Sequence, residues 1–143
     1  EDRLMKYWEV SIGKWHKPWN KQLKEELSIK DKRSIKGLAW AEQPQTIHEV
    51  GSTFTIQGFN LSYAGVILGP SVKYRDGKIV FDPSASSNEK AVRNRTLSDG
   101  TKKKFGEILI QHEVRVLMTR GVNGMYIYAC DPELQAALLA AAK

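Results

Sequence analysis

Two short apolar segments, separated by a long amphipathic one, most strongly limit how this chain can fold. Residues 64–68 (AGVIL) and 125–130 (MYIYAC) carry apolar or aromatic side chains at consecutive positions. Such runs are typical of strands that are buried on both faces of a parallel sheet. Between them, residues 103–119 show apolar side chains at spacings of three and four, which is the helical pattern. Strand, helix and strand in this order predict an α/β domain.

Caps, turns and short periodic runs predict the remaining elements. In the first half these are a strand over 7–12, a loop over 13–20, helices over 22–28 and 31–41 capped by Asn20 and Asp31, and a strand over 47–55 with a bulge at Gly51. In the second half they are a hairpin over 71–81 that turns at Asp76-Gly77, a short helix within 87–95, and a helix capped by Asp131 with Pro132 at its first position.

The size and charge of the chain set broad limits on its class. Its 143 residues are enough for one domain or for part of a larger protein. Because the chain begins without Met, we expect residues 1–143 to form a single domain that is a C-terminal fragment, with residues 70–100 as a hairpin and basic insertion. The net charge of +6 permits a polyanionic partner without demanding one. The single cysteine, Cys130, and the lack of an apolar span indicate a cytoplasmic protein.

Motifs that would make the chain an enzyme by itself are missing from the sequence. The phosphate-binding loop G-x-x-x-x-G-K-[ST] and the dinucleotide fingerprint G-x-G-x-x-G do not occur. His16, His48 and His112 lack the spacing of metal ligands, so we expect no metal site. The chain alone is therefore not expected to hydrolyse a nucleotide.

Arg120 stands where ligands tend to bind. It lies between the predicted helix over 103–119 and the strand over 125–130. Strand ends in an α/β sheet commonly form ligand sites, and a guanidinium can hold a phosphate with a fork of donors. The alternative is an arginine that pairs with a surface carboxylate and serves only the fold.

Two segments resemble the last motifs of superfamily 1 helicases. VLMTRGVNGMYIY, residues 116–128, resembles the motif in which a helix ends in Thr-Arg and a strand follows. STFTIQGFNLSYAGVILG, residues 52–69, resembles the preceding motif, in which a Lys/Gln-Gly pair leads into a strand. The order of the motifs looks closest to bacterial ATP/GTP-binding proteins with helicase-type motifs, which are catalogued as a domain of unknown function. The resemblance covers residues 44–135 well.

The resemblance implies a fold and a shared nucleotide site. In such enzymes two RecA-like domains hold ATP with Mg²⁺ between them. This chain would be the C-terminal one, a three-layer domain with a mainly parallel sheet and a β-hairpin insertion, and its partner would be the N-terminal RecA-like domain of the same protein. Arg120 would act as an arginine finger. Gln57, Gly58, Asn60 and Thr119 would lie at the nucleotide, where Gly58 lets the backbone approach a phosphate.

DNA or RNA is the second partner that the resemblance implies. Ser52 and Thr55 would couple the nucleotide to nucleic-acid contacts. Arg93, Lys102 and Lys103 belong to a basic stretch that could follow phosphates, although a solvated loop explains them equally well.

The chain departs from the helicase pattern at two positions. Phe54 stands where a His is usual, and Asn60 where a Glu is usual, so the handling of the nucleotide would differ. A non-catalytic nucleic-acid-binding or protein-interaction module on an α/β fold is therefore the alternative.

Trp8, Trp15 and Trp19 lie among lysines near the start of the chain. They could stack bases of a nucleic acid, but tryptophans more often pack in a small core or cover a neighbouring domain.

Overall fold

The structure is a computed structural model, and it describes residues 8–142. These residues fall into two compact units, one ending at Leu61 and the other beginning at Ser62, and each is described by itself. Tyr7, with which the first strand was predicted to begin, lies outside the described residues.

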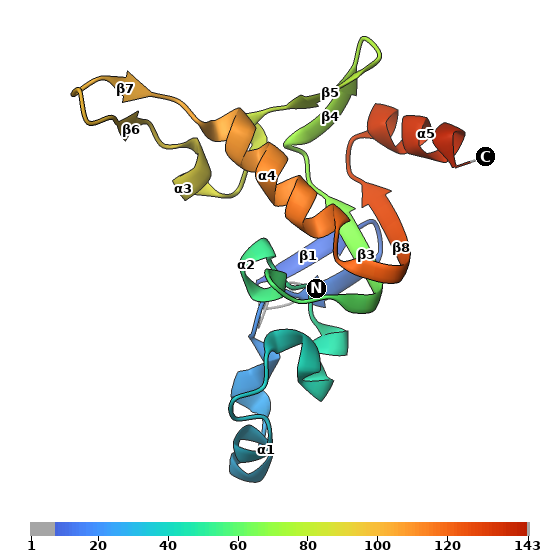
Figure 1. Cartoon of the computed structure of the whole chain (residues 1–143). Coiled ribbons are helices and arrows are strands. Elements are labelled where there is room, and N and C mark those ends of the chain that lie inside the picture. Colours follow the sequence, from blue (N-terminus) through green and yellow to red (C-terminus); the bar gives the residue numbers. More distant parts are fainter. Residues whose placement is uncertain (1–7, 143) are drawn as a thin grey trace, which may run out of the picture. The chain divides into compact units, whose positions relative to one another are not determined.

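The first unit opens with an antiparallel ribbon (Figure 1). Strand β1 (Glu9–Ile12) pairs with β2 (Trp15–Pro18) across a turn in which Gly13 has a φ of 57°. The prediction of a loop over 13–20 is therefore wrong. Pro18 excludes a helix but is compatible with the end of a strand, where its missing N–H is not needed.

Short helical turns make up the rest of the first unit. They are the 3-10 helices η1 (Leu23–Glu26), η2 (Trp40–Glu42) and η3 (Pro44–His48), and the α-helices α1 (Ile29–Ser34) and α2 (Thr53–Ile56). Ser28, rather than Asp31, caps α1, because the Ser28 side chain accepts a hydrogen bond from the Asp31 backbone N–H. Asn20 has a φ of 47° and caps no helix.

The strand predicted over 47–55 is wrong, because η3 and α2 occupy both ends of that segment. Only Val50 takes part in β pairing, through a parallel bridge to Trp19 beside β2. Gly51 is not a bulge: a Cβ there would lie 2.8 Å from Cη2 of Trp40. The close packing of the Trp40 ring against the backbone explains this glycine.

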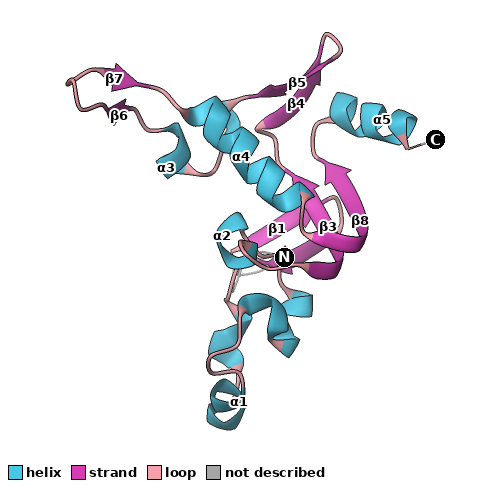
Figure 2. Cartoon of the chain, viewed as in Figure 1, coloured by secondary structure: helices cyan, strands magenta, loops and turns pink. Residues whose placement is uncertain are grey.

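The second unit is built on two strands that lie far apart in the sequence. Strand β3 (Leu61–Leu68) pairs with β8 (Gly121–Ala129) (Figure 2). Tyr63 packs against Gly124 at one end, and the Leu68 carbonyl accepts from the Cys130 N–H at the other, so the strands run in parallel. Helix α4 (Gly106–Met118) precedes β8, as the apolar periodicity predicted.

Two hairpins and three further helical segments complete the second unit. In chain order they are the hairpin β4 (Val72–Arg75) and β5 (Lys78–Phe81), the 3-10 helix η4 (Pro83–Ala85), helix α3 (Glu89–Val92), the hairpin β6 (Arg95–Thr96) and β7 (Lys102–Lys103), and helix α5 (Pro132–Ala141). The β4–β5 turn has positive φ at Asp76 and Gly77, as its sequence predicted.

The core of the second unit lies where β3, β8, α4 and α5 meet. Its buried members are Val66, Leu68, Ile110, Ala129 and Leu134, together with Val72 at the start of β4. Val114 and Leu117 extend it along the face of α4 on which Ile110 lies. Alternate residues of β3 point into this core, which fixes the strand register.

The structure confirms the α/β class, although it differs from the predicted sheet. The described residues form four two-stranded sheets, of which only β3–β8 is parallel. The mainly parallel sheet of a three-layer domain is thus not found in residues 8–142. The predicted burial of both strands on both faces is also wrong, because Tyr63 of β3 and Tyr126 and Tyr128 of β8 are exposed. Apolar runs predicted the strands, but they do not say how many other strands join them or whether both faces are covered.

Candidate functional site

Arg120 lies at the junction of α4 and β8, and its side chain is bound to the helix end. Its Nε donates to the Val116 carbonyl at 2.8 Å, and Nη2 donates to Thr119 Oγ1 at 2.9 Å. Thr119 Oγ1 in turn donates to the carbonyls of Arg115 (3.0 Å) or Val116 (3.1 Å). A cation at the carboxyl end of a helix is favoured by the helix dipole. The half-buried guanidinium is thereby held at the start of β8.

Gln57 and Gly58 form the turn that ends α2 in the first unit. Gln57 N–H donates to the Thr53 carbonyl, and Phe59 N–H donates to that of Ile56. Gly58 has a φ of 80°, and a Cβ at this position would meet no atom of residues 8–142 within 4 Å. Its conformation, rather than a close neighbour within the chain, therefore requires glycine here. The side chain of Gln57 is exposed.

The other predicted residues of this segment lie beside that turn. Thr55 Oγ1 donates to the Ser52 carbonyl at 2.8 Å and lies 3.4 Å from Ser52 Oγ. Asn60 and Phe54 are exposed. The fold thus brings Ser52, Thr55, Gln57, Gly58 and Asn60 together in the first unit, whereas Thr119 and Arg120 belong to the second. Their meeting at one nucleotide stays a prediction.

The basic stretch forms an exposed arm in the second unit. Arg95 pairs with Lys103, and Thr96 with Lys102, in the β6–β7 hairpin. All residues from Arg93 to Lys104 are exposed. The Lys103 ammonium lies over the Phe105 ring, 5.7 Å from its centroid. Both interpretations of this stretch, as a phosphate contact or as a solvated loop, are compatible with this exposure.

Sequence reasoning missed Glu49, a buried carboxylate that organises the first unit. Glu49 is 8% exposed and accepts hydrogen bonds from the backbone N–H groups of Lys21 (3.1 Å) and Leu23 (2.6 Å). It also accepts from Trp40 Nε1 at 3.0 Å. Asn20 and Lys21 both have positive φ, so this carboxylate holds a turn that non-glycine residues rarely adopt.

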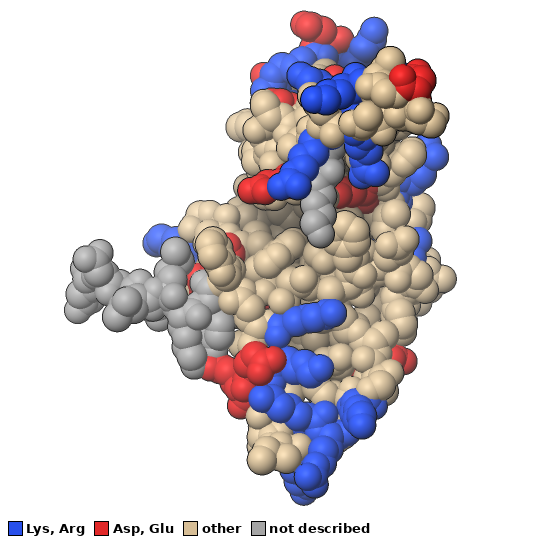
Figure 3. Space-filling view, turned by 90° about the vertical axis from the view of Figure 1, so that its left-hand side faces the viewer, with Lys and Arg blue, Asp and Glu red and all other residues tan. Residues whose placement is uncertain are grey.

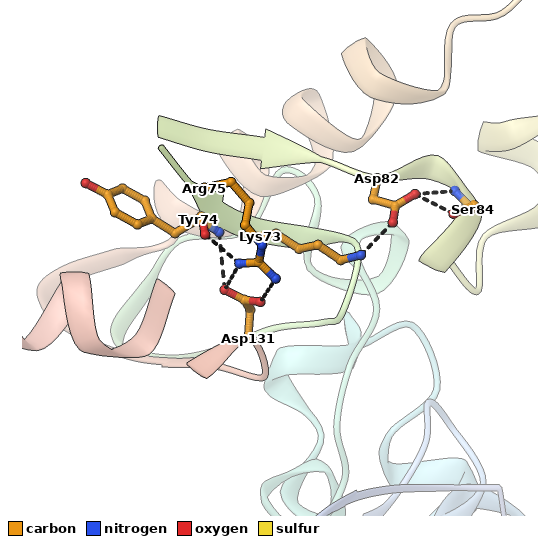
Figure 4. A network of polar contacts seen from close by, with 6 residues as sticks. All are labelled: Lys73, Tyr74, Arg75, Asp82, Ser84 and Asp131. Carbon is orange, nitrogen blue, oxygen red and sulfur yellow. Dashed lines mark hydrogen bonds and ion pairs between the residues drawn. The ribbon is translucent and has the colours of Figure 1, made fainter. Parts of the chain in front are cut away.

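A second network links the β4–β5 hairpin to the start of α5 (Figure 4). Arg75 makes a two-pronged contact with Asp131, with distances of 3.0 and 2.8 Å. Asp131 also accepts from the backbone N–H groups of Tyr74 and Leu134, the second of which is the helix cap that the sequence predicted. The pairing with Arg75 had no sequence signal, because the two residues are 56 positions apart.

The carboxyl groups in this region are strongly stabilised in their ionised form. The Arg75 guanidinium holds the pKa of Asp131 well below its ordinary value, helped by the two backbone N–H groups. At the other end of β4, hydrogen bonds from Lys73 and Ser84 lower the pKa of Asp82 to about 2. Both groups therefore stay charged in the folded protein at pH values where free aspartates become protonated.

In the Asp131→Asn variant, we expect the free energy of unfolding to fall less steeply as the pH is lowered. The folded pKa of Asp131 lies below the ordinary value of about 3.9, so the unfolded chain binds the proton first as pH falls. The contribution of Asp131 to the free energy of unfolding is thus complete at pH values above about 3.9, and it is lost as the pH falls below that value. Urea unfolding, followed by circular dichroism at neutral pH and near pH 3, measures this. Glu133→Gln is the control: its carboxylate lies 3.3 Å from Arg75 but is 61% exposed. An equally steep acid loss in Asp131→Asn would contradict the assignment.

The described part of the chain shows no sign of a metal site or of a membrane-spanning helix. Residues 8–142 contain no group of three or more His, Cys, Asp or Glu that could hold a metal ion. Among the same residues, no helix has the length and apolar character needed to cross a membrane.

Comparison with known proteins assigns the chain to a helicase-type family. It belongs to the family described as Schlafen group 3, DNA/RNA helicase domain, whose model matches residues 1–131. An uncharacterized protein of Saccharomyces cerevisiae is 41% identical over 112 residues, which cover 73% of this chain and 23% of the yeast protein. The chain thus matches less than a quarter of that relative. No solved structure matches significantly.

These findings support the helicase-type part of the resemblance that the motifs showed. They do not support the bacterial group, since the matching relative is a yeast protein.

Proposed function

We propose that this chain supplies the second, RecA-like motor domain of a helicase-type NTPase, and that the rest of the nucleotide site lies in an N-terminal domain of the same protein. The family match over residues 1–131 is the observation that carries the proposal. The pairing of β3 with β8 adds support. The two strands are parallel and helix α4 lies between them in the sequence, which is the order that a RecA-like domain requires.

Arg120 is the proposed catalytic residue. Its bonds to Val116 and Thr119 fix the base of the guanidinium at the α4–β8 junction, so that little entropy is lost when it meets a phosphate. There it would stabilise the charge that develops as the γ-phosphate is transferred. Thr119 would orient Arg120 through its hydroxyl and is the proposed nucleotide contact of the second unit.

Gln57, Gly58 and Asn60 are the proposed nucleotide contacts of the first unit. The turn after α2 exposes all three residues, which makes their side chains and backbone accessible to a ligand. Ser52, Thr55, Arg93, Lys102 and Lys103 are the proposed nucleic-acid contacts. ATP with Mg²⁺ would be the cofactor, and the missing domain would provide the phosphate loop and the metal ligands. We propose a cytoplasmic location.

One observation favours the non-catalytic alternative. The bonds of Arg120 to the end of α4 are what a purely structural arginine would make. Phe54 and Asn60, which replace the usual His and Glu, point the same way. A protein that binds nucleic acid without hydrolysing ATP would fit these features.

Measurement of ATP hydrolysis separates the two functions. We expect the full-length protein to hydrolyse ATP in the presence of Mg²⁺, faster when single-stranded nucleic acid is added. The chain of residues 1–143 should show no turnover, because it has no phosphate loop. Turnover by the chain alone would contradict the shared site. A full-length protein that binds nucleic acid but never hydrolyses ATP would establish the alternative.

A further inference from the structure

The register of the β1–β2 ribbon gathers three tryptophans on one face. Residues directly opposite in an antiparallel pair share a face, and alternate residues along a strand return to it. Ile12 lies opposite Trp15, and Val10 lies opposite Lys17. The next pair on the same face is Trp8 and Trp19, where the Trp19 N–H donates to the Trp8 carbonyl. This tryptophan face, as we call it, consists of Trp8, Val10, Ile12, Trp15, Lys17 and Trp19.

The tryptophans of this face are not packed in a core. Trp8 is 83% exposed, Trp15 43% and Trp19 39%. A large aromatic surface left in water is costly and usually marks a binding site. The expectation that these side chains fill a small core is therefore wrong for the described residues, whereas the expectation that they cover a neighbouring domain stays a prediction.

The open end of the ribbon is held rigid. Gln22 Nε2 donates to the carbonyls of Trp8 (2.7 Å) and Trp19 (2.5 Å), and Gln22 Oε1 accepts from the Trp8 N–H (2.8 Å). Just beyond Trp19, Glu49 fixes the strained turn at Asn20 and Lys21. The aromatic rings are thus presented on a backbone that loses little freedom when a ligand binds.

The charges around the tryptophan face favour a polyanion. Lys17 lies on the face, with Lys14 in the turn and Lys21 just beyond Trp19. The acidic residue of the ribbon, Glu9, lies on the opposite face, where it contacts His16 Nδ1 at 3.2 Å. Away from the ribbon, Figure 3 shows further Lys and Arg side chains toward the α1 end of this unit, with Asp and Glu side chains beside them.

We propose that the tryptophan face binds a single-stranded nucleic acid, with bases stacked on Trp8, Trp15 and Trp19 and phosphates near Lys14, Lys17 and Lys21. Aromatic platforms beside cations hold single strands in this way. Along β1 from Trp8 to Ile12, which lies opposite Trp15, the face spans about 13 Å at roughly 3.3 Å per residue. That length matches about four stacked nucleotides at 3.4 Å each. The inference takes the class of ligand from the proposed function, but it requires neither ATP nor a second domain.

Binding of fluorescein-labelled oligothymidylate and oligouridylate of about twelve nucleotides to the chain tests this. Trp8→Ala should weaken binding about tenfold, and Trp8→Ala with Trp15→Ala about a hundredfold, whereas Trp8→Phe should retain most of the affinity. Tyr126→Ala is the matched control, since Tyr126 is 72% exposed in the second unit. A duplex should bind more weakly, because its bases are already stacked.

The role of the lysines is tested by measuring how oligonucleotide affinity depends on salt concentration. Lys17→Gln should reduce the slope of log affinity against log salt concentration by about 0.7, the value for one phosphate contact on a single strand. Lys78→Gln, an exposed position on β5 with the same loss of charge, should leave the slope unchanged.

Three results would overturn the proposal. They are unchanged affinity in the variant with both Trp8→Ala and Trp15→Ala, an equal loss of affinity in Tyr126→Ala, and equally tight binding of duplex. A tryptophan variant that loses self-association but still binds the oligonucleotide would show a protein interface instead. Failure of the proposed function is separate: the full-length protein could lack ATP hydrolysis while the chain still binds oligonucleotides through these tryptophans.

Discussion

Arg120→Ala in the full-length protein is expected to lower the turnover of ATP by about a thousandfold or more, with a much smaller change in ATP affinity. An arginine finger acts on charge that appears mainly in the transition state, so its loss affects turnover more than binding. Arg120→Lys should recover little, because an ammonium lacks the planar fork of donors. Steady-state hydrolysis, nucleotide binding and thermal unfolding on each variant provide the measurements.

Arg115→Ala is the matched control for this prediction. Arg115 lies on the exposed side of α4, one turn before the junction. Its removal should leave turnover unchanged. If Arg120 only anchors the end of α4 through Val116, Arg120→Ala would lower the melting temperature and ATP affinity together. Normal turnover in a stably folded Arg120→Ala protein would remove the catalytic role.

Glu49→Ala is expected to lower the free energy of unfolding of the first unit by about 3 kcal/mol or more. A buried donor left without an acceptor costs about 1–3 kcal/mol, and Glu49 serves three part-buried donors, for which we take the lower value of about 1 kcal/mol each. Glu49→Gln keeps one acceptor oxygen and should cost less. All four tryptophans of the chain lie in this unit, at positions 8, 15, 19 and 40, so their fluorescence during urea titration follows its unfolding.

Glu25→Ala provides the comparison for Glu49. The Glu25 side chain is 83% exposed and lies 3.5 Å from Lys32. Such surface pairs contribute about 0–1 kcal/mol. An equal loss of stability in the two alanine variants would mean that the three hydrogen bonds of Glu49 do not organise the unit.

Elements with strong local signals were predictable from the sequence. Apolar periodicity identified α4, the Asp76-Gly77 pair identified the β4–β5 turn, and Asp131-Pro132 identified the start of α5. In each case the residues that specify the element lie within it or next to it. The two apolar runs also identified the strands β3 and β8, but their pairing with each other came only from the structure.

The first unit was predicted poorly because its structure depends on distant contacts. Its described residues include few buried hydrophobic side chains, among them Ile35 and Ile56, so there is little periodicity to detect. Glu49 instead organises the turn at Asn20 and Lys21 from 28 positions away. The positive φ values of those two residues have no signature in sequence patterns that expect glycine at such positions.

The contact between Arg75 and Asp131 also constrains when the second unit can finish folding as it leaves the ribosome. The β4–β5 hairpin is local and can close within about 1–10 μs. Its anchor at Asp131 is 56 residues further along the chain. At about 5–20 residues per second, that carboxylate is added about 3–11 seconds later. Throughout this interval the Tyr74 N–H and the Arg75 guanidinium lack this acceptor. The β4–β5 hairpin must therefore wait for Asp131 before it can be fixed to the rest of the unit.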